Sequence, residues 1–543
     1  MLFRSGKGQN NVPKQLVNHR EATTRGLRPE SFSARNSPWL TKCLNLRPTQ
    51  WGLKAHYSLT QPITDVYITG TLGESKSWPS PQLFHGKTVT LLCFPDAVYT
   101  VNESTYTCTL VDTKALDGTS AAITTGKDWH FVDMYDSWML FNGTSTVWKT
   151  AWSENVYTQD DVTIVTGATH KEGWLLLGGF SGFYNTVDWQ TYWRDWVGDM
   201  PSTIDERADV APGYNWIWWS SFLAPDMLQM FFQDALNYQS YATSPDTGFT
   251  SAKPFAIDLL ERNEAGMRPM PWRGKVLGIA PLGDGMVVYG ENGIRYLAPY
   301  NEAVVKTYGV YEFNGLPPHV GVYNGTTSRS AFCAGNDRHI FMEPSGELWH
   351  LLPNLQAERL GYREYLSGLD VNKVVITHDP LYDEFYIADG TLAYHLSKNG
   401  LSKHSTMPTK IHTLKSGAIN TIKFSTDSSA AQIETEKAVT PTGEIQTLTR
   451  IRLVGLTASS TGWTLKVRYR TRPIDDWTDT ASLSLDSAVE WNGAISVLEY
   501  KILLDATAAS AVTLEDIEVE FDTDVYGGSS AKLAASTPSG ATE

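Results

Sequence analysis

The sequence is poor in the residues that mark disulfide scaffolds, zinc sites and membrane spans. Only four of its 543 residues are cysteine, and Cys43, Cys93, Cys108 and Cys333 show no CxxC spacing. This argues against a zinc site and predicts buried, reduced thiols, although a Cys93–Cys108 bridge across a hairpin stays open. No run of about 18 apolar residues occurs, so we expect no membrane span. The first residues, MLFRSGKGQNNVPK, lack the apolar segment of a signal peptide, and we expect synthesis in the cytoplasm.

Charged residues are also scarce, at 19% of the chain, whereas aromatic residues are abundant, with 19 tryptophans and 25 tyrosines. A chain of this composition can bury a large apolar area, so we expect a folded protein and not a disordered scaffold. Its length is too great for one compact core and predicts about two to four domains.

The net charge of −15 is unevenly distributed along the chain. Residues 1–50 hold nine lysines and arginines against two glutamates, a balance of +7, and the remainder therefore carries −22. We interpret 1–50 as an extended basic arm, either solvated or lying on an acidic neighbour such as another copy of the chain, with nucleic acid as the least favoured partner. The arm interpretation predicts that a chain without residues 1–42 still folds. Its candidate contact residues are Arg4, Lys7, Lys14, Arg20, Arg25 and Arg28.

Helical periodicity is rare. The best candidates are residues 224–241 and, more weakly, residues 253–266. Almost everything else consists of short alternating or apolar runs separated by glycine, asparagine, aspartate and proline, which is typical of an all-β fold.

One β-hairpin pattern recurs along the chain. In residues 284–297, DGMVVYGENGIRYL, an apolar run enters a glycine turn and is followed by a strand that carries an aromatic residue. The same order occurs at 136–150, 337–352 and 383–397, and weaker versions occur at 172–185 and 95–110. Because repeats of about 45 residues with a strong hairpin are typical of β-propellers, we predict a propeller over 51–415, with a β-sandwich as the alternative.

A tryptophan-rich stretch at about 185–272 interrupts the repeat. We predict an inserted, partly helical subdomain whose aromatic residues fill its core or form a contact with another protein, ahead of a sugar-binding platform. The candidate residues are Trp189, Trp193, Trp196, Trp216, Trp218 and Trp219.

The composition changes after about residue 415. Apolar and polar residues alternate with a period of two, which predicts a carboxy-terminal antiparallel β-sandwich over 416–526. Its expected inward residues are Val467, Tyr469, Ile502, Leu504, Ile517, Val519 and Phe521. We expect the small residues of 527–543 to form a flexible tail.

No catalytic, cofactor-binding or metal-binding signature is present. The sequence lacks G-x-S-x-G, H-E-x-x-H and P-loop patterns, and its twelve histidines are scattered. The stretch SPDTGFTS at 244–251 is a degenerate form of the Asp box found in sialidase-type propellers. Carboxylate pairs such as Asp379 with Asp383 or Glu384 could serve glycoside hydrolysis, but a chain with 59 acidic residues offers many such pairs. We therefore expect no enzymatic activity and no cofactor.

A family resemblance begins at residues 43–63, CLNLRPTQWGLKAHYSLTQPI. This stretch, followed by propeller-like hairpins, resembles the tail nozzle, or hub, proteins of short-tailed bacteriophages. KVLGIAPLGDGMVVYGENGIRYLAP is similar to one of their blades, and VVITHDPLYDEFYIADGTLAYHLSKNGLSKHST to their last blade. RIRLVGLTASSTGWTLKVRYRTRP resembles their β-rich carboxy-terminal part, whereas the tryptophan-rich insertion departs from the family pattern.

The resemblance implies a structural protein of the virion tail, made in the host cytoplasm. Nozzle proteins form a ring, usually of six copies, below the portal and adaptor, and genomic DNA leaves through their channel without sequence-specific binding. The implied partners are other copies of the chain, the adaptor and a tail fibre or spike. The alternatives are another tail or fibre-attachment protein, and a propeller glycosidase or carbohydrate-binding module.

Overall fold

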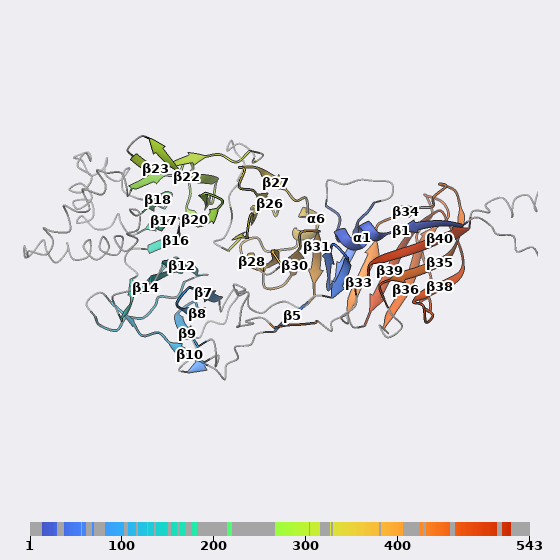
Figure 1. Ribbon diagram of the computed structural model, residues 1–543, viewed down its shortest axis with the longest axis horizontal. Coiled ribbons are helices and arrows are strands. Elements are labelled where there is room, and N and C mark those ends of the chain that lie inside the picture. Colours follow the sequence, from blue (N-terminus) through green and yellow to red (C-terminus); the bar gives the residue numbers. More distant parts are fainter. Residues whose placement is uncertain are drawn as a thin grey trace, which may run out of the picture. The chain divides into compact units, whose positions relative to one another are not determined.

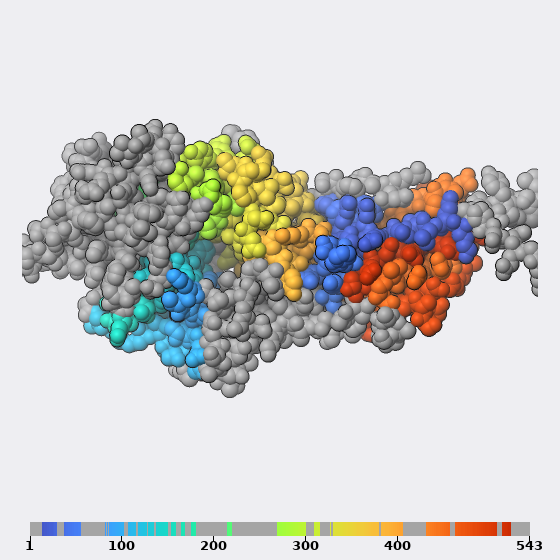
Figure 2. All heavy atoms as spheres, viewed as in Figure 1, coloured from blue at the N-terminus to red at the C-terminus, as the bar shows by residue number. Residues whose placement is uncertain are grey.

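The computed structural model divides the chain into two compact units (Figure 1 and Figure 2). Unit 1 consists of Met1–Thr60, Ala393–Thr406 and Lys423–Glu543, and unit 2 consists of Gln61–Leu392 and Met407–Ile422. The structure describes residues 14–29, 37–55, 57–60, 68–69, 82–102, 107–115, 118–126, 129–134, 137–149, 154–159, 163–169, 175–181, 214–219, 266–302, 305–314, 316, 326, 330–379, 382–405, 423–426, 430–456, 462–507 and 513–522. Strands dominate both units, which confirms the predicted all-β class.

Unit 2 is a succession of small sheets, in which most neighbouring strands are also consecutive in the chain. The first two sheets have the orders β6-β10-β9-β8-β7 and β11-β15-β14-β13-β12. Their strands are β6 (Ile68–Thr69), β7 (Gln82–His85), β8 (Thr90–Phe94), β9 (Ala97–Val101), β10 (Cys108–Leu110), β11 (Thr113–Lys114), β12 (His130–Met134), β13 (Ser137–Phe141), β14 (Thr146–Lys149) and β15 (Val156–Gln159).

Three four-stranded antiparallel sheets follow, together with helix α6 and the hairpin β28–β29. Their elements are β16 (Thr163–Thr169), β17 (Leu175–Ser181), β18 (Trp216–Trp219) and β19 (Gly266–Pro269); β20 (Val276–Leu282), β21 (Gly285–Gly290), β22 (Ile294–Glu302) and β23 (Val305–Tyr311); β24 (Phe332–Ala334), β25 (His339–Met342), β26 (Leu348–Leu351) and β27 (Ala357–Arg359); then α6 (Arg363–Leu366), β28 (Val375–Asp379) and β29 (Glu384–Ala388).

The hairpin predicted from DGMVVYGENGIRYL is present as β21 and β22. Met286 lies opposite Leu297, and Tyr289 lies opposite Ile294. The predicted hairpins at 136–150 and 337–352 are β13–β14 and β25–β26. Every residue of β13, β21, β25 and β29 is buried, because these inner strands of the repeat are covered on both faces. Tyr296, the aromatic residue of the second strand, is buried, and it belongs to an apolar cluster with residues of the next sheet.

Consecutive sheets of unit 2 pack directly against each other. The first strand of one sheet contacts the first strand of the next, in the series β12, β16, β20, β24 and β28. β20 and β24 approach each other closely. The ring of Phe332 on β24 fills the space beside Gly278 on β20, where a side chain would otherwise lie. The same ring stacks on Tyr289, with 4.1 Å between the ring centroids. Apolar clusters therefore span neighbouring sheets instead of closing within each one.

Unit 1 combines strands from both ends of the sequence. A four-stranded sheet has the order β1-β40-β35-β38, and a second sheet includes the order β31-β2-β33-β39-β36-β37, with β34 paired to β39. Its elements are β1 (Lys14–Asn18), α1 (Arg20–Arg25), β2 (Leu40–Leu44), β3 (Leu46–Thr49), β4 (Gly52–Ala55), β5 (Tyr57–Thr60), β30 (Ala393–Leu396), β31 (Leu401–His404), β32 (Lys423–Thr426), β33 (Ala431–Thr435), β34 (Ala438–Val439), β35 (Gln446–Val454), β36 (Trp463–Arg470), β37 (Thr478–Asp479), β38 (Glu490–Val497), β39 (Glu499–Ala506) and β40 (Asp516–Asp522).

The apolar faces of these two sheets contact each other. Tyr500 on β39 and Phe521 on β40 are fully buried, with 5.4 Å between their ring centroids. Six of the seven inward residues predicted from the alternating pattern are buried as expected, and Tyr469 is half-buried. The pattern predicts this core because side chains alternate between the two faces of a strand.

The structure corrects the interpretation of residues 1–50 as an extended arm. From Lys14 onward, the described part of this segment is folded into unit 1: β1 pairs with β40, and β2 lies between β31 and β33. Leu27 and Leu40 are almost fully buried there. The segment is therefore part of the core of unit 1, because its apolar residues complete both sheets.

Part of the predicted tryptophan-rich insertion is also a regular strand. Residues 216–219 form β18, which pairs with β17 and β19. The other predictions for about 185–272 concern residues that the structure does not describe. They are the helices at 224–241 and 253–266, of which only Gly266 is described, as the first residue of β19, and the degenerate Asp box. The tail at 527–543 also lies outside the described residues. No helix in the described residues is long and apolar enough to cross a membrane.

Candidate functional site

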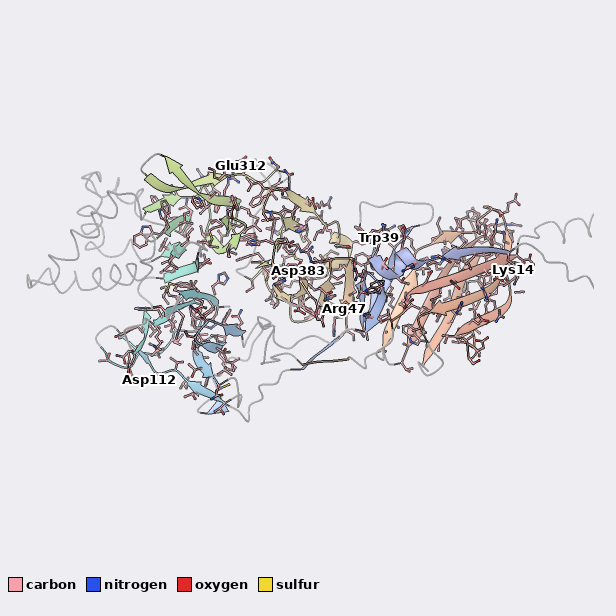
Figure 3. All side chains as sticks on the ribbon, in the orientation of Figure 1. Lys14, Trp39, Arg47, Asp112, Glu312 and Asp383 are labelled. Atoms are coloured by element: carbon pink, nitrogen blue, oxygen red, sulfur yellow. The ribbon has the colours of Figure 1, made fainter. Side chains whose placement is uncertain are left out.

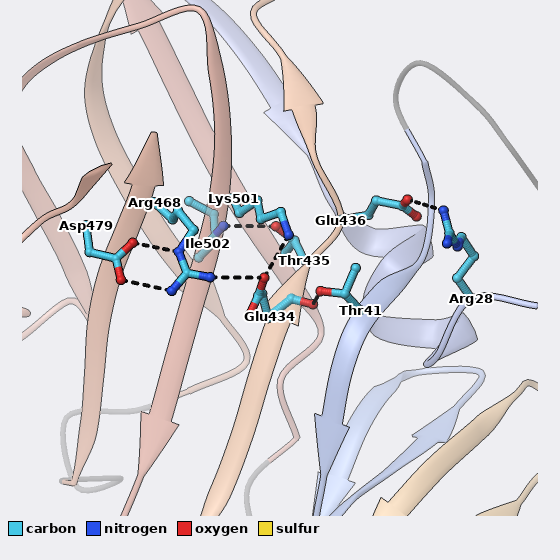
Figure 4. Close-up of polar contacts among 9 residues, drawn as sticks. All are labelled: Arg28, Thr41, Glu434, Thr435, Glu436, Arg468, Asp479, Lys501 and Ile502. Carbon is cyan, nitrogen blue, oxygen red and sulfur yellow. Dashed lines mark hydrogen bonds and ion pairs between the residues drawn. The ribbon is translucent and has the colours of Figure 1, made fainter. Parts of the chain in front are cut away.

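Of the four described basic residues proposed as contacts, three form ion pairs within unit 1. Lys14, which Figure 3 labels, has its Nζ 2.5 Å from Glu520 Oε1, and Arg28 Nη1 lies 2.6 Å from Glu436 Oε1 (Figure 4). Arg25 lies 3.5 Å from a carboxylate oxygen of Glu21 and sits over the ring of Trp39. Arg20 is exposed on α1, and Arg4 and Lys7 lie outside the described residues. Much of the positive charge in 14–28 is therefore balanced by carboxylates of the same unit.

Three of the six tryptophans proposed as contacts lie in the described residues. Trp218 and Trp219 on β18 are buried, and Trp219 packs with Trp272 and other apolar residues of the third and fourth sheets. Trp216 is half-buried. Trp218 and Trp219 thus lie in the interior of unit 2, whereas Trp189, Trp193 and Trp196 lie outside the described residues.

Ion pairs connect the strands of the larger sheet of unit 1 (Figure 4). Arg468 on β36 donates two hydrogen bonds to the carboxylate of Asp479, at 2.6 and 2.9 Å. These bonds lower the pKa of Asp479. Glu434 on β33 lies 2.8 Å from Lys501 Nζ and 3.7 Å from Arg468 Nη1. Such half-exposed pairs add little stability each, but together they fix the register of neighbouring strands.

A second row of charges crosses the four-stranded sheet of unit 1. Glu520 on β40 lies between Lys14 on β1 and Arg450 on β35, whose Nη2 is 3.0 Å from Glu520 Oε2. Arg450 Nη1 is in turn 3.8 Å from a carboxylate oxygen of Glu490 on β38. Although burial opposes it, the hydrogen bond from Lys14 and the charge of Arg450 lower the pKa of the Glu520 carboxyl. The four side chains form a row of alternating charge from one sheet edge to the other.

This row of charges was not predicted from the sequence. The alternation of arginine with apolar residues in TRIRL and of glutamate with apolar residues in IEVEF places like charges on one face of each strand. That pattern was a usable signal for two strands of opposite charge lying side by side. The contribution of Lys14 had no such local signal, since its partner is about 500 residues away in sequence.

The carboxylates considered for glycoside hydrolysis lie around the turn between β28 and β29. Asp379, Asp383 and Glu384 are each less than a tenth exposed, at 3%, 5% and 7%. Asp383 has a positive φ of 53°, its Oδ1 lies 2.8 Å from His378 Nε2, and Arg338 Nη2 donates to its carbonyl oxygen at 3.2 Å. In this conformation, the carboxylate of Asp383 holds a tight turn in place.

A hollow of about 650 Å³ lies between the first two sheets of unit 2. Lys114 lies within it, with its Nζ 2.7 Å from Asp112 Oδ2 and 2.9 Å from Ser120 Oγ (Figure 3 labels Asp112). Within the described chain, no group of three or more potential metal ligands is assembled. The hollow offers hydrogen-bonding groups to a small polar molecule. It is lined by Thr88, Val89, Thr100, Val111, Asp112, Lys114, Trp138, Lys149, Glu154, Asn155 and Val156.

All four cysteines are free thiols, so the Cys93–Cys108 bridge is not formed. Three are buried and Cys333 is half-buried, in line with the predicted reduced state. Burial raises the pKa of Cys108 to about 11 and that of Cys333 to about 12. Thiols held in the protonated form are poor nucleophiles, which fits a structural role.

No protein-family model matches the chain, and no curated protein matches it significantly. Among solved structures, it is similar to PorZ of the type-IX secretion system of Porphyromonas gingivalis, with a TM-score of 0.33 and 9% identity over 65% of this chain and 35% of PorZ. It is also similar to YCF48 bound to a D1 peptide (TM-score 0.31, 8% identity, 60% of this chain and 83% of YCF48). The Pan2 WD40 domain of Neurospora crassa gives a TM-score of 0.30 and 6% identity, over 82% of this chain and 90% of that domain. Similarity at this level carries no information about the function of this chain.

Proposed function

We propose that the chain is a structural protein of a phage tail, a nozzle or hub whose copies form a ring around the channel for DNA ejection. In this proposal, unit 2 is a β-propeller and the two sheets of unit 1 are a β-sandwich. The partners are other copies of the chain, the adaptor below the portal and a tail fibre or spike. Arg4, Lys7, Trp189, Trp193 and Trp196 are candidate contact residues.

The observation that carries the proposal is the serial contact between first strands in unit 2. In a propeller, the first strand of each blade lies near the axis, so these strands contact one another from blade to blade. The series β12, β16, β20, β24 and β28 has this relation, and each sheet from β12 onward contributes its strands in chain order. The geometry supports the blade pattern on which the resemblance to nozzle proteins rests.

The charge of the chain supports a passive channel wall. Outside residues 1–50 the chain carries a net charge of −22. A wall of this sign repels the phosphate backbone of DNA, so the polymer can slide past it without being held. A protein built to grip DNA would instead present clusters of lysine and arginine to the phosphates.

Electron microscopy of the purified full-length chain tests the proposal. We expect closed rings with an axial channel, and retention of the ring at moderate salt. A chain that stays monomeric at micromolar concentration and in the presence of its tail partners would contradict a nozzle role.

The alternative of a glycosidase or carbohydrate-binding propeller predicts a different result. A monomer of that kind would retain or cleave glycans, and a substitution in the hollow of unit 2 such as Lys114→Ala would weaken the effect. We expect no glycan retention by the ring-forming protein.

A further inference from the structure

The hollow between the first two sheets of unit 2 has an apolar base. Trp138 on β13 and Val156 on β15 are the buried residues of its lining, and both belong to the apolar cluster that joins the two sheets. Val89 and Val111 also line the hollow and pack against the same cluster. Its volume of about 650 Å³ is typical of a site for a small molecule. A ligand in the hollow therefore meets an apolar surface at its inner end.

Two charged side chains in the lining have no counter-ion. Lys149 lies opposite Trp138 in the pairing of β14 with β13, so the two side chains share one face of the sheet. Within the described chain, the side chains of Lys149 and Glu154 form neither an ion pair nor a hydrogen bond. Lys114, by contrast, is neutralised by Asp112, with 2.7 Å between Nζ and Oδ2. The described lining thus offers one ammonium group and one carboxylate to a ligand.

The ammonium groups belong to the more buried residues of this lining. Lys149 is half-buried, whereas Glu154 is exposed. The paired lysine follows the same order, since the side chain of Lys114 is 23% exposed and that of Asp112 is 71% exposed. A half-buried ammonium group has lost part of its hydration, and an anion beside it restores the lost interaction. The lining is therefore suited to a ligand with a carboxylate at its inner end and an ammonium group at its outer end.

We propose that the hollow binds a short peptide with free termini. The terminal carboxylate pairs with Lys149, the terminal ammonium group pairs with Glu154, and an apolar side chain packs on Trp138. Thr88 and Thr100 also line the hollow, and their hydroxyl groups are suited to hydrogen bonds with the peptide groups between the termini. A neutral sugar would leave both charges without a partner. The site lies within one chain and is independent of the proposed ring.

Titration calorimetry of the full-length chain with the tripeptide Ala-Leu-Ala tests the site. We expect binding of the free peptide. Amidation of its carboxy terminus or acetylation of its amino terminus should weaken binding about tenfold, because each change removes one charged partner.

Two variants of the chain assign these losses to residues. Lys149→Gln should weaken binding of the free peptide about tenfold and leave the affinity of the amidated peptide unchanged, since that peptide has already lost the same ion pair. Glu154→Gln should behave in the same way toward the acetylated peptide. Both variants should keep the denaturation midpoint of the unchanged chain, because neither side chain has a polar partner to lose among the described residues.

Lys275→Gln is the matched control. Lys275 is exposed, its side chain has no ion pair within the described part of the chain, and it does not line the hollow. This variant should bind the free peptide as tightly as the unchanged chain does. An equal loss of affinity in Lys275→Gln and Lys149→Gln would show a general effect of charge and overturn the proposal.

Three further results would contradict the peptide site. They are no binding at millimolar tripeptide, equal affinity for the free, amidated and acetylated peptides, and tighter binding of the neutral trisaccharide maltotriose than of the tripeptide. The last result would favour the carbohydrate-binding alternative. A ring that binds no peptide would overturn this site and leave the nozzle role intact, whereas a monomer that binds the peptide would support the site and contradict the nozzle.

Discussion

Gly278 is a residue at which the packing of unit 2 leaves no room for a side chain. A Cβ atom there would lie 2.0 Å from two ring atoms of Phe332, which itself stacks on Tyr289. We expect Gly278→Ala to lower the free energy of unfolding by about 2 to 3 kcal/mol, because the rings between two sheets must shift. Denaturant unfolding of the full-length chain measures the loss.

Gly346→Ala is the control for this substitution. Gly346 has a φ of 80° and open space around its Cα, so alanine there costs only the backbone strain of about 1 kcal/mol. The double variant Gly278→Ala/Phe332→Leu should recover part of the loss. If Gly278→Ala costs no more than Gly346→Ala, the close approach of the two sheets is wrong.

At the residue scale, the sequence predicted burial better than it predicted partners. Alternation of apolar and polar residues identified Val467, Ile502 and Val519 as core residues, since the period of a strand is local information. The hydrogen-bond partner of Asp383, His378, is also nearby in sequence, but the positive φ of Asp383 was not predictable because aspartate is enriched in that conformation without being restricted to it. The ion pairs across sheets depend on register between distant strands, which local patterns do not contain.

At the scale of elements, strand β2 gives the clearest test of unit 1. β2 lies in the interior of its sheet, between β31 and β33, and Leu40 and Cys43 on it are almost fully buried. Deletion of residues 1–42 removes β1, α1 and the first half of β2. We now expect this truncation to abolish the folding of unit 1, in contrast to the arm interpretation, because a central strand is lost from one sheet and an edge strand from the other.

Amide hydrogen exchange measured by mass spectrometry reports on this truncation. Protection of β35 and β39 should be lost in the chain without residues 1–42 and retained in a chain without residues 1–13, all of which precede β1. Full protection of both strands in the longer truncation would restore the interpretation of the segment as an arm.

The hairpins of unit 2 were predictable because their information is local. An apolar run, a glycine turn and an aromatic strand within 15 residues identified β21–β22, and the same pattern identified β13–β14 and β25–β26. The first residues of the chain were misassigned for the opposite reason. β1 and β2 are each only five residues long and are far apart in the sequence. Basic residues flank both strands, so the few apolar residues that complete unit 1 form no clear strand pattern.

For the whole molecule, the structure predicts sensitivity to acid. Burial lowers the pKa of two histidines, His19 in unit 1 and His339 in unit 2, from 6.5 to about 4. Between these values the unfolded chain binds a proton at each site and the folded chain does not. The contribution of each histidine to stability is therefore constant above pH 6.5 and is lost as the pH falls toward about 4, by about 3 kcal/mol.

The contacts of His339 allow this loss to be isolated. Its Nδ1 lies 2.8 Å from the hydroxyl of Tyr289, and its Nε2 lies 2.7 Å from the carbonyl oxygen of Pro281. A neutral ring can accept one bond and donate the other. We expect His339→Gln to flatten the decline in unfolding free energy between pH 6.5 and about 4, whereas Tyr289→Phe should keep the histidine and the decline. Equal slopes in both variants would exclude His339 as the cause.

The pairing of β1 with β40 has a consequence for the order of events during synthesis. Asn18 lies opposite Glu518, so about 500 residues must leave the ribosome before the first strand finds its partner. At about 5 to 20 residues per second, the amino-terminal strand waits roughly 25 to 100 s. During that interval unit 2 can complete its local hairpins, while the nascent chain carries the apolar residues of β2 without their final cover. Among the described residues, the last strand to be translated, β40, thus completes the unit that the first strand, β1, began.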